Sequence, residues 1–353
     1  MPLTTRPLRT LALALAMAGA GLAGGCAGTA VMAQEAGTGG PVARVGFEHF
    51  GGEKVQRPAT GIFGDTEDWI IAHQIAAIRL DPAHDSGGPP VIMLPGYGIA
   101  VDSYLETPDG REGWAMDMVR AGHQVWLAEL SHTTRSGIDT GFYHPDSGSA
   151  TKSLFSWGGS SVWRRWGLGP EPGVPFADSR FPADGWDAVV ASFTGVGAAV
   201  LDGGGQIGFQ LEANIRALEA LTEKTGPAII LLHSASGVAG FEFARRHPDR
   251  VDALVVVEPV GCPADLADVP VLGVFGDHME VREQIVPRRE ECRALADALA
   301  ARGDKGALWS LPDMGIRGNS HLMMMEDNSA DIMAMIREWL ASVPHKPRPG
   351  TGP

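Results

Sequence analysis

A serine stands where a short apolar run gives way to a helical pattern. The run Ile229–Leu232 is followed by the pentapeptide HSASG at 233–237 and then by the helical stretch Val238–Arg246. A strand that turns sharply into a helix holds a serine at its carboxyl end with the hydroxyl exposed, and the helix N-terminus favours developing negative charge. This order predicts Ser234 as the nucleophile of an acyl-transfer reaction.

The turn departs from the G-x-S-x-G pattern that is usual for such nucleophiles. Leu232 and Ser236 occupy the two glycine positions. Ser236 is therefore a rival nucleophile, and an N-capping serine on an ordinary crossover helix is the structural alternative. We favour Ser234 because it lies one residue past His233, at the end of the strand, where the turn is expected.

A serine hydroxyl needs a base to take its proton, and after a turn of this kind the chain order is serine, acid, histidine. His321 fits, because the small polar loop 318–321 follows the last predicted strand and precedes the terminal amphipathic helix. His247 ends a helix, His278 follows a strand too early, and His345 lies in the tail. We expect His321 to be the base.

Two carboxylates compete for the acid position. The strand Leu254–Val257 ends at Glu258, and the strand Val271–Phe275 ends near Asp277. The acid must accept the second N–H of the imidazole, and either side chain could do so. Asp277 holds the commoner position for such an enzyme and Glu258 the alternative one, so the residues alone leave both open.

The tetrahedral intermediate needs backbone N–H groups to stabilise its oxyanion. One is expected from Ala235, the residue after the nucleophile, and the other from Tyr97 in the loop Leu94–Gly98, which follows the strand Val91–Leu94. No G-x-G-x-x-G opens a helix and no Cys/His cluster has zinc-site spacing. We therefore expect neither a metal nor an organic cofactor.

The elements that must position these residues alternate between short apolar runs and amphipathic helices such as Leu211–Thr225, which predicts an α/β fold with a mostly parallel central sheet flanked by helices. The expected strands are Val42–Phe47, Ile70–Leu80, Val91–Leu94, Gln124–Leu130, Ile229–His233, Leu254–Glu258, Val271–Phe275 and Leu308–Leu311. The period of Ile70–Leu80 is also compatible with a helix.

Residues 132–200 break this alternation. The segment is rich in Gly, Pro and Ser and contains four of the nine tryptophans: Trp157, Trp163, Trp166 and Trp186. A long irregular insertion in an α/β fold is expected over the carboxyl ends of the strands, where ligands bind. We predict an inserted cap whose aromatic residues line a substrate pocket or form the cap's own small core.

The first residues have the layout of a secretory signal peptide, with Arg6 and Arg9 ahead of an apolar stretch. We predict a signal peptide at 1–33, a flexible leader at 34–41, one domain at 42–343 and a disordered tail at 344–353. Cleavage before Cys26, with a lipid anchor on that residue, is the alternative. The protein is expected to be exported, as a periplasmic, secreted or lipid-anchored protein without a transmembrane helix.

Composition excludes one class of partner and indicates one cross-link. The net charge is −14 and basic residues form no run longer than a pair, so the sequence has no basic segment of the kind that binds nucleic acid. Of the three cysteines, Cys262 and Cys292 remain after processing. An oxidising compartment favours a disulfide between them, and two unpaired buried thiols are the alternative.

Several motifs together resemble one family, the secreted novel bacterial esterase group of the α/β-hydrolase superfamily. They are PGYG at 95–98, ETPDGREGWA at 106–115, GHQVWLAEL at 122–130, HSASG at 233–237, VVVEP at 255–259, FGDH at 275–278 and GNSH at 318–321. The resemblance implies an α/β-hydrolase fold and an ester hydrolase whose acid is a glutamate after the strand that follows the nucleophile, which favours Glu258. Pro95 replaces the histidine that is usual in the oxyanion loop.

The sequence thus predicts a serine carboxylic-ester hydrolase that forms an acyl-enzyme, with a small-molecule ester as substrate. The same residues could serve a lactonase, an amidase or a polyester hydrolase, because acyl-transfer groups do not name the leaving group. An envelope protein of this fold that binds a ligand without catalysis is the alternative from another class.

Overall fold

The computed structural model describes residues 40–59, 66–139, 151–200 and 210–347. The predicted signal peptide, the Cys26 anchor and most of the predicted leader lie outside these residues. The predicted tail is described only to Pro347, and within it the backbone N–H of Lys346 donates to Asp252 Oδ1 at 2.8 Å. Domain boundaries at the two ends therefore stay predictions.

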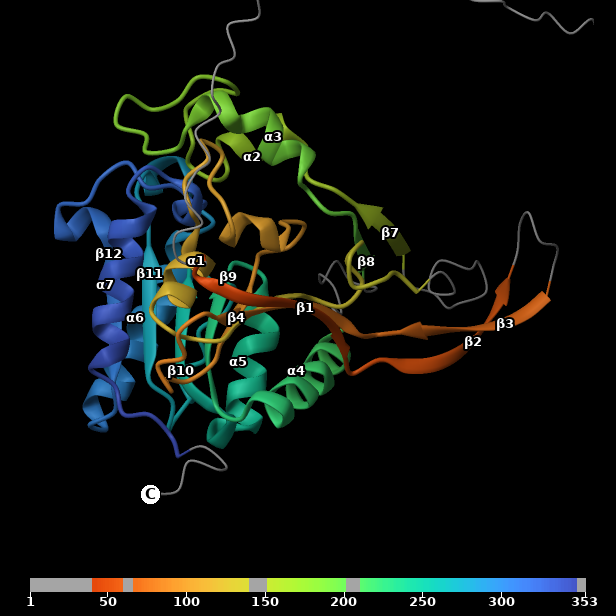
Figure 1. Cartoon of the computed structure of the whole chain (residues 1–353). Helices are drawn as coiled ribbons and strands as arrows, with labels where there is room; N and C mark the ends of the chain where they lie inside the picture. The colour runs from red at the N-terminus through yellow and green to blue at the C-terminus, as the bar shows by residue number, and fades with distance from the viewer. Residues whose placement is uncertain (1–39, 60–65, 140–150, 201–209, 348–353) are drawn as a thin grey trace, which may run out of the picture. The chain divides into compact units, whose positions relative to one another are not determined.

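An eight-stranded sheet forms the centre of the fold, with strand order β1-β4-β6-β5-β9-β10-β11-β12 (Figure 1). Its strands are β1 (Val42–Phe50), β4 (Ile75–Pro82), β5 (Val91–Leu94), β6 (Val125–Glu129), β9 (Ala228–His233), β10 (Val251–Val257), β11 (Val271–Phe275) and β12 (Gly306–Ser310). From β6 to β12 neighbouring strands are parallel, and β1 and β4 pair antiparallel at one edge. Strands β5, β9, β10 and β11 are buried along their whole length, as expected for apolar runs covered on both faces. The predicted α/β fold is confirmed.

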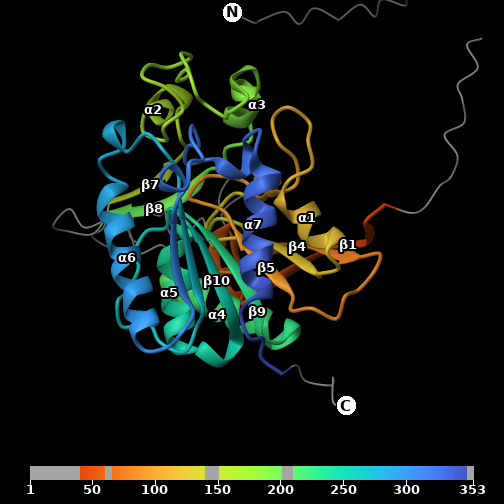
Figure 2. The ribbon, with the colours of Figure 1, turned by 90° about the vertical axis from the view of Figure 1, so that its left-hand side faces the viewer.

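Helices cover both faces of this sheet. They are α1 (Trp114–Arg120), α4 (Leu211–Thr225), α5 (Ser236–Arg246), α6 (Val286–Ala301) and α7 (Ser329–Ala341), and Figure 2 shows their arrangement. Apolar residues of α1 and α7 join one core cluster, and those of α4, α5 and α6 join another. The sheet is therefore the middle of three layers, which leaves its strand ends as the place for polar chemistry.

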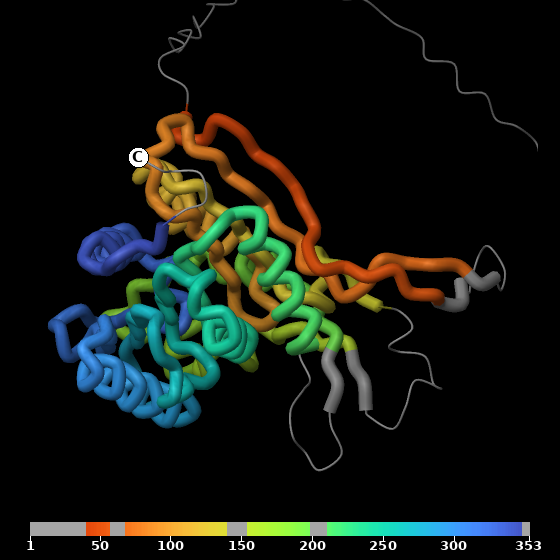
Figure 3. Tube along the Cα trace, turned by 90° about the horizontal axis from the view of Figure 1, so that it is seen from below, coloured from red at the N-terminus to blue at the C-terminus, as the bar shows by residue number. Residues whose placement is uncertain are grey.

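The prediction of one strand over Ile70–Leu80 was wrong. The segment is divided into β3 (Thr66–Ala72) and β4, with a break at His73, whose φ is 67°. A left-handed backbone at a non-glycine residue ends the pleat, so β3 leaves the central sheet and pairs with β2 (Glu53–Ala59). Figure 3 shows this two-stranded ribbon extending away from the helices.

The predicted cap region lies between β6 and α4. It contains β7 (Thr151–Phe155), α2 (Gly159–Trp163), α3 (Trp186–Ala191) and β8 (Val196–Val200), and β7 and β8 form a separate antiparallel pair. Two of its tryptophans, Trp163 and Trp166, are buried, while Trp157 and Trp186 are partly buried. The cap's tryptophans thus pack into the core as well as against the strand ends.

A covalent cross-link ties the loop after β10 to a helix. The disulfide that the composition favoured joins Cys262, in that loop, to Cys292 on α6. Within the described ranges, no helix is long and apolar enough to cross a membrane.

Candidate active site

Ser234 lies in the sharp turn between β9 and α5, with a φ of 54°. Its backbone N–H donates to the Val257 carbonyl at 3.0 Å, and its own carbonyl accepts the N–H of Val260 at 2.8 Å. These bonds to the end of β10 hold a backbone conformation that serine rarely adopts, as expected of a nucleophile turn. Ser234 is half-buried and lies at the carboxyl edge of the sheet.

Ser236, the rival nucleophile, occupies a different environment. It is fully buried, and its hydroxyl lies 3.0 Å from the Leu94 carbonyl and 2.9 Å from both the N–H and the carbonyl of His233. A hydroxyl that is bonded to three backbone groups cannot reach a substrate. Ser236 instead ties the loop after β5 to the nucleophile turn.

His321 and Glu258 form a buried pair. The Nδ1 atom of His321 lies 2.6 Å from Glu258 Oε2, and the exposed fractions of the two residues are 3% and 0%. Burial lowers the pKa of His321 below its ordinary value, against the raising influence of the Glu258 carboxylate. The imidazole is thus held neutral, with its second nitrogen free of Glu258, in the form that can accept a proton.

Glu258 is held as a carboxylate by a residue that sequence reasoning missed. Arg282, which is also fully buried, forms an ion pair with Glu258 Oε2, and the Gly276 N–H donates to Oε1 at 2.8 Å. Burial alone would raise the pKa of Glu258, but the Arg282 charge and the His321 hydrogen bond outweigh it and hold the pKa at about 2. No motif marks Arg282, because it lies in a short irregular segment 24 residues from its partner.

Asp277, the alternative acid, does not contact His321 in this arrangement. Its Oδ1 accepts the N–H of His278 at 2.8 Å, and its Oδ2 accepts the N–H of Gly318 at 3.1 Å. Asp277 therefore caps the start of the loop 318–321, which we call the histidine loop, while Glu258 contacts the ring of His321.

His233 joins the oxyanion loop to the histidine loop. The Gly96 N–H donates to Nδ1 of His233 at 3.1 Å, so its Nε2 is the protonated nitrogen and donates to the His321 carbonyl at 2.9 Å. Full burial keeps its pKa well below the ordinary value. A Cβ at Gly96 would lie 2.9 Å from this ring and 3.0 Å from Cβ of Ser234, so only glycine allows the loop this close.

The two residues predicted to supply the oxyanion N–H groups are Ala235, in the turn before α5, and Tyr97, in the loop after β5. Ala235 is the N-cap residue of α5, where the first N–H groups have no acceptor within the helix. Tyr97 follows Gly96 directly, and its carbonyl accepts a hydrogen bond from the Trp157 indole. Within the described residues, no hydrogen bond joins Ser234 Oγ to the His321 ring, a link that tightens in many enzymes only when substrate binds.

A second buried glutamate supports the backbone of the histidine loop. Glu326 accepts the Ser320 N–H at 2.6 Å and the Asn319 side-chain amide at 2.5 Å. Burial raises the pKa of Glu326 to about 7, although these hydrogen bonds lower it. Glu326 thus fixes the backbone of the loop 318–321, and Glu258 fixes the ring of His321.

Aromatic residues of the cap lie between the oxyanion loop and the histidine. The chain of ring contacts runs from Tyr97 through Phe155, Trp157 and Trp166 to His321, with centroid separations of 5.9, 4.6, 5.8 and 5.8 Å. The Trp166 carbonyl also accepts the His321 N–H at 2.8 Å. We call Tyr97, Phe155, Trp157 and Trp166 the aromatic wall. It gives the site an apolar flank.

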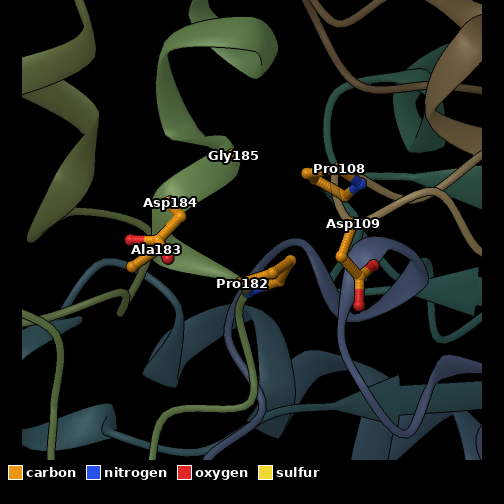
Figure 4. A pocket seen from close by; sticks show the side chains of 6 residues that line it. All are labelled: Pro108, Asp109, Pro182, Ala183, Asp184 and Gly185. Carbon is orange, nitrogen blue, oxygen red and sulfur yellow. The ribbon is translucent and has the colours of Figure 1, made fainter.

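A hollow of about 420 Å³ opens elsewhere between the cap and the loop before α1. Figure 4 shows Pro108 and Asp109 on one side of it and the cap segment 182–185 on the other. None of the predicted catalytic residues lines this hollow.

Comparison with known proteins agrees with the fold. The structure is similar to the atomic-resolution structure of a novel bacterial esterase, with a TM-score of 0.76 and 27% sequence identity over 87% of this chain and 98% of that chain. The chain has the α/β-hydrolase fold. In sequence, this hydrolase is 25% identical over 309 residues to the "Probable secreted lipase phiG" of a fungal species (strain ATCC 74256), covering 71% of this chain and 81% of the relative. No protein-family model matches it.

The family resemblance that the motifs predicted is confirmed, and the comparisons support a hydrolase of the esterase and lipase kind.

Proposed function

We propose that this protein is a serine carboxylic-ester hydrolase that works through an acyl-enzyme. The observation that carries the proposal is the Glu258–His321 pair, with 2.6 Å between the carboxylate and the ring. Ser234, in a strained turn, is tied to the same strand end because its N–H donates to the Val257 carbonyl at 3.0 Å. Acyl transfer requires a nucleophile, a base and a group that orients the base, and the positions of Ser234, His321 and Glu258 after strands of the central sheet support these three roles.

In the proposed mechanism, His321 removes the Ser234 proton as the hydroxyl attacks the ester carbonyl. Glu258 stabilises the imidazolium that forms, and its low pKa keeps it charged throughout. The N–H groups of Tyr97 and Ala235 hold the oxyanion, and His321 then protonates the leaving alcohol. Water, activated by the same histidine, releases the acid.

The aromatic wall supports a substrate with an apolar part. Its rings adjoin both His321 and the loop of Tyr97, so an acyl chain or an apolar alcohol would bury surface there. The N-terminal pattern and the secreted relative support export, and we propose a periplasmic or secreted location.

The decisive experiment replaces the nucleophile. Ser234→Ala is expected to lower kcat/KM for small activated esters by at least about 10³-fold without changing thermal stability, because only the attacking oxygen is lost. Ser160→Ala, at an exposed serine on the cap, is the matched control and should keep full activity. Hydrolysis at more than a tenth of the wild-type rate by Ser234→Ala would contradict the proposal.

Two further readouts separate the alternatives. A fluorophosphonate probe should label the wild type and the control but not Ser234→Ala, whereas a ligand-binding protein without catalysis would stay unlabelled. A panel of esters, lactones, amides and polyesters then identifies the substrate class, and faster turnover of any class other than esters would replace carboxylic-ester hydrolysis as the function.

A further inference from the structure

A cluster of metal-ligating side chains lies outside the proposed catalytic residues, where the cap meets the loop after β11. Asp178 comes from the cap, and Asp277 and His278 follow β11. One ligand atom from each of the three lies within 4.8 Å of the others. Sequence spacing gave no sign of this cluster, because the cap residue and the loop residues lie far apart in the chain.

The Nε2 atom of His278 in this cluster is buried and has no hydrogen-bond partner among the described residues. The residue is 8% exposed. That nitrogen lies 3.3 Å from Asp178 Oδ1, outside hydrogen-bond geometry. Two ligands bonded to Zn²⁺ at tetrahedral angles are also about 3.3 Å apart. The separation therefore fits two donors that face one ion.

The surroundings hold these donors as the outer groups of a metal site would. Each Asp277 oxygen accepts one backbone N–H, from His278 or from Gly318, and each keeps a lone pair for a further partner. Glu280 Oε1 lies 3.5 Å from Nδ1 of His278, so a carboxylate faces the nitrogen that would not bind the metal. This carboxylate–histidine arrangement is common around zinc.

Backbone contacts keep the two halves of the cluster together. The Arg180 N–H donates to the Gly318 carbonyl at 3.1 Å, and the Phe176 ring stacks on the His278 ring with centroids 3.8 Å apart. Gly318, with a φ of 80°, lies so close to the Asp178 carbonyl that a Cβ would lie 1.7 Å from that oxygen. The backbone of Asp178 is thus fixed beside Gly318, and its exposed side chain extends from there toward His278.

We propose that Asp178, Asp277 and His278 bind a divalent transition-metal ion of the Zn²⁺ type, with water as the fourth ligand. One imidazole nitrogen and two carboxylate oxygens suit such an ion, whereas Ca²⁺ takes oxygen ligands only. The ion joins the cap to the loop after β11, and the Asp277 carboxylate of that loop also accepts the N–H of Gly318. Its role is therefore structural, as a clamp between the cap and the loop after β11.

The test uses the purified chain without a histidine tag, treated with chelator and returned to chelator-free buffer. Titration calorimetry with Zn²⁺ should show one site per chain, and saturating Zn²⁺ should raise the thermal midpoint by about 5 °C. Asp178→Asn should weaken binding at least about tenfold and abolish the rise. Asp184→Asn, at another aspartate of the cap, is the matched control and should behave as wild type.

Absence of Zn²⁺ binding, or equal binding by Asp178→Asn and Asp184→Asn, would overturn the proposal. Tighter binding of Ca²⁺ than of Zn²⁺ would overturn the choice of ion. His278→Gln repeats the measurement at a second ligand, so a folding defect in one variant does not decide the result. Neither readout uses ester hydrolysis, so the outcome is independent of the proposed function.

Discussion

Two neighbouring strands each end in an acidic residue, and the surroundings of the two acids differ sharply. Strands β10 and β11 pair in parallel, so Glu258 and Asp277 leave the sheet at the same edge. Glu258 is fully buried and contacts Arg282 and the His321 ring. Asp277 is half-buried and binds backbone N–H groups.

This contrast shows that the position of an acidic residue at a strand end does not determine its role. Glu258 meets the ring because its backbone, with a φ of 42°, turns the side chain under the histidine loop, where Arg282 compensates its charge. Asp277 lies one strand further along, where the same loop begins, and it fixes that loop's backbone. The neighbouring residues decide the role of each acid. Substitutions at the two acids and at their neighbours therefore test this difference.

The largest expected effect separates the two acids by activity. Glu258→Gln should lower kcat/KM for esters by about 10³–10⁴-fold, because the amide cannot stabilise the imidazolium and favours the wrong ring orientation. Asp277→Asn should lower it by less than about tenfold, since Asp277 does not contact the ring. Steady-state kinetics on both variants checks this, and a severe loss in Asp277→Asn alone would transfer the acid role to that residue.

The next effect separates the two arginines by stability. Arg282→Met leaves Glu258 buried without its counter-charge and should reduce the free energy of unfolding by about 3–5 kcal/mol. Arg317, whose exposed guanidinium lies 3.9 Å from Asp277, is the matched control, and Arg317→Met should cost less than about 1 kcal/mol.

Urea denaturation measures both arginine variants. Adding Glu258→Gln to Arg282→Met should restore part of the lost stability, because the uncompensated charge is then gone. Equal stability of the two arginine variants would show that the buried pair does not hold the site.

The smallest effect concerns how stability depends on pH, and it adds Glu326 to the comparison. The folded-state pKa of Glu258 is about 2, below its unfolded value of 4.5, so its stabilisation is present above pH 4.5 and is lost as the pH falls through about 2. The pKa of Glu326 is raised to about 7, so the stabilisation from its protonated form is present below pH 4.5 and is lost as the pH rises through 7.

Each of these contributions is about 3 kcal/mol at full strength. Unfolding curves from pH 2 to 8 should therefore show the acid limb flattened in Glu258→Gln and the decline between pH 4.5 and 7 flattened in Glu326→Gln. Curves for Glu258→Gln that parallel the wild type at low pH would contradict a low pKa for Glu258.

Local sequence patterns were sufficient to predict the fold and the positions of some of the candidate site residues. An apolar run, a turn of small residues and a helix determine a strand–turn–helix wherever they occur, so Ser234 could be located without any long-range contact. The same holds for the loops of Tyr97 and His321, which follow strands recognisable from composition. Buried parallel strands are continuous apolar runs, and this is why the α/β fold was predictable.

Where a pattern was ambiguous, the sequence could not decide. Apolar residues continue across His73, so nothing in the period of Ile70–Leu80 marks the left-handed residue that divides the segment into two strands. Glu258 and Asp277 were equal by strand position, and only the family resemblance favoured Glu258.

The types and the order of the residues at the strand ends follow from the sequence alone. Which of them come into contact depends on the tertiary structure: Glu258 with Arg282, His233 with the loops of Gly96 and His321, and Asp178 with His278. The physical reason is that strand and helix patterns arise from neighbours in the chain. The charge and hydrogen-bond partners of a buried group are instead set by loops that are distant in sequence and meet only when the layers pack.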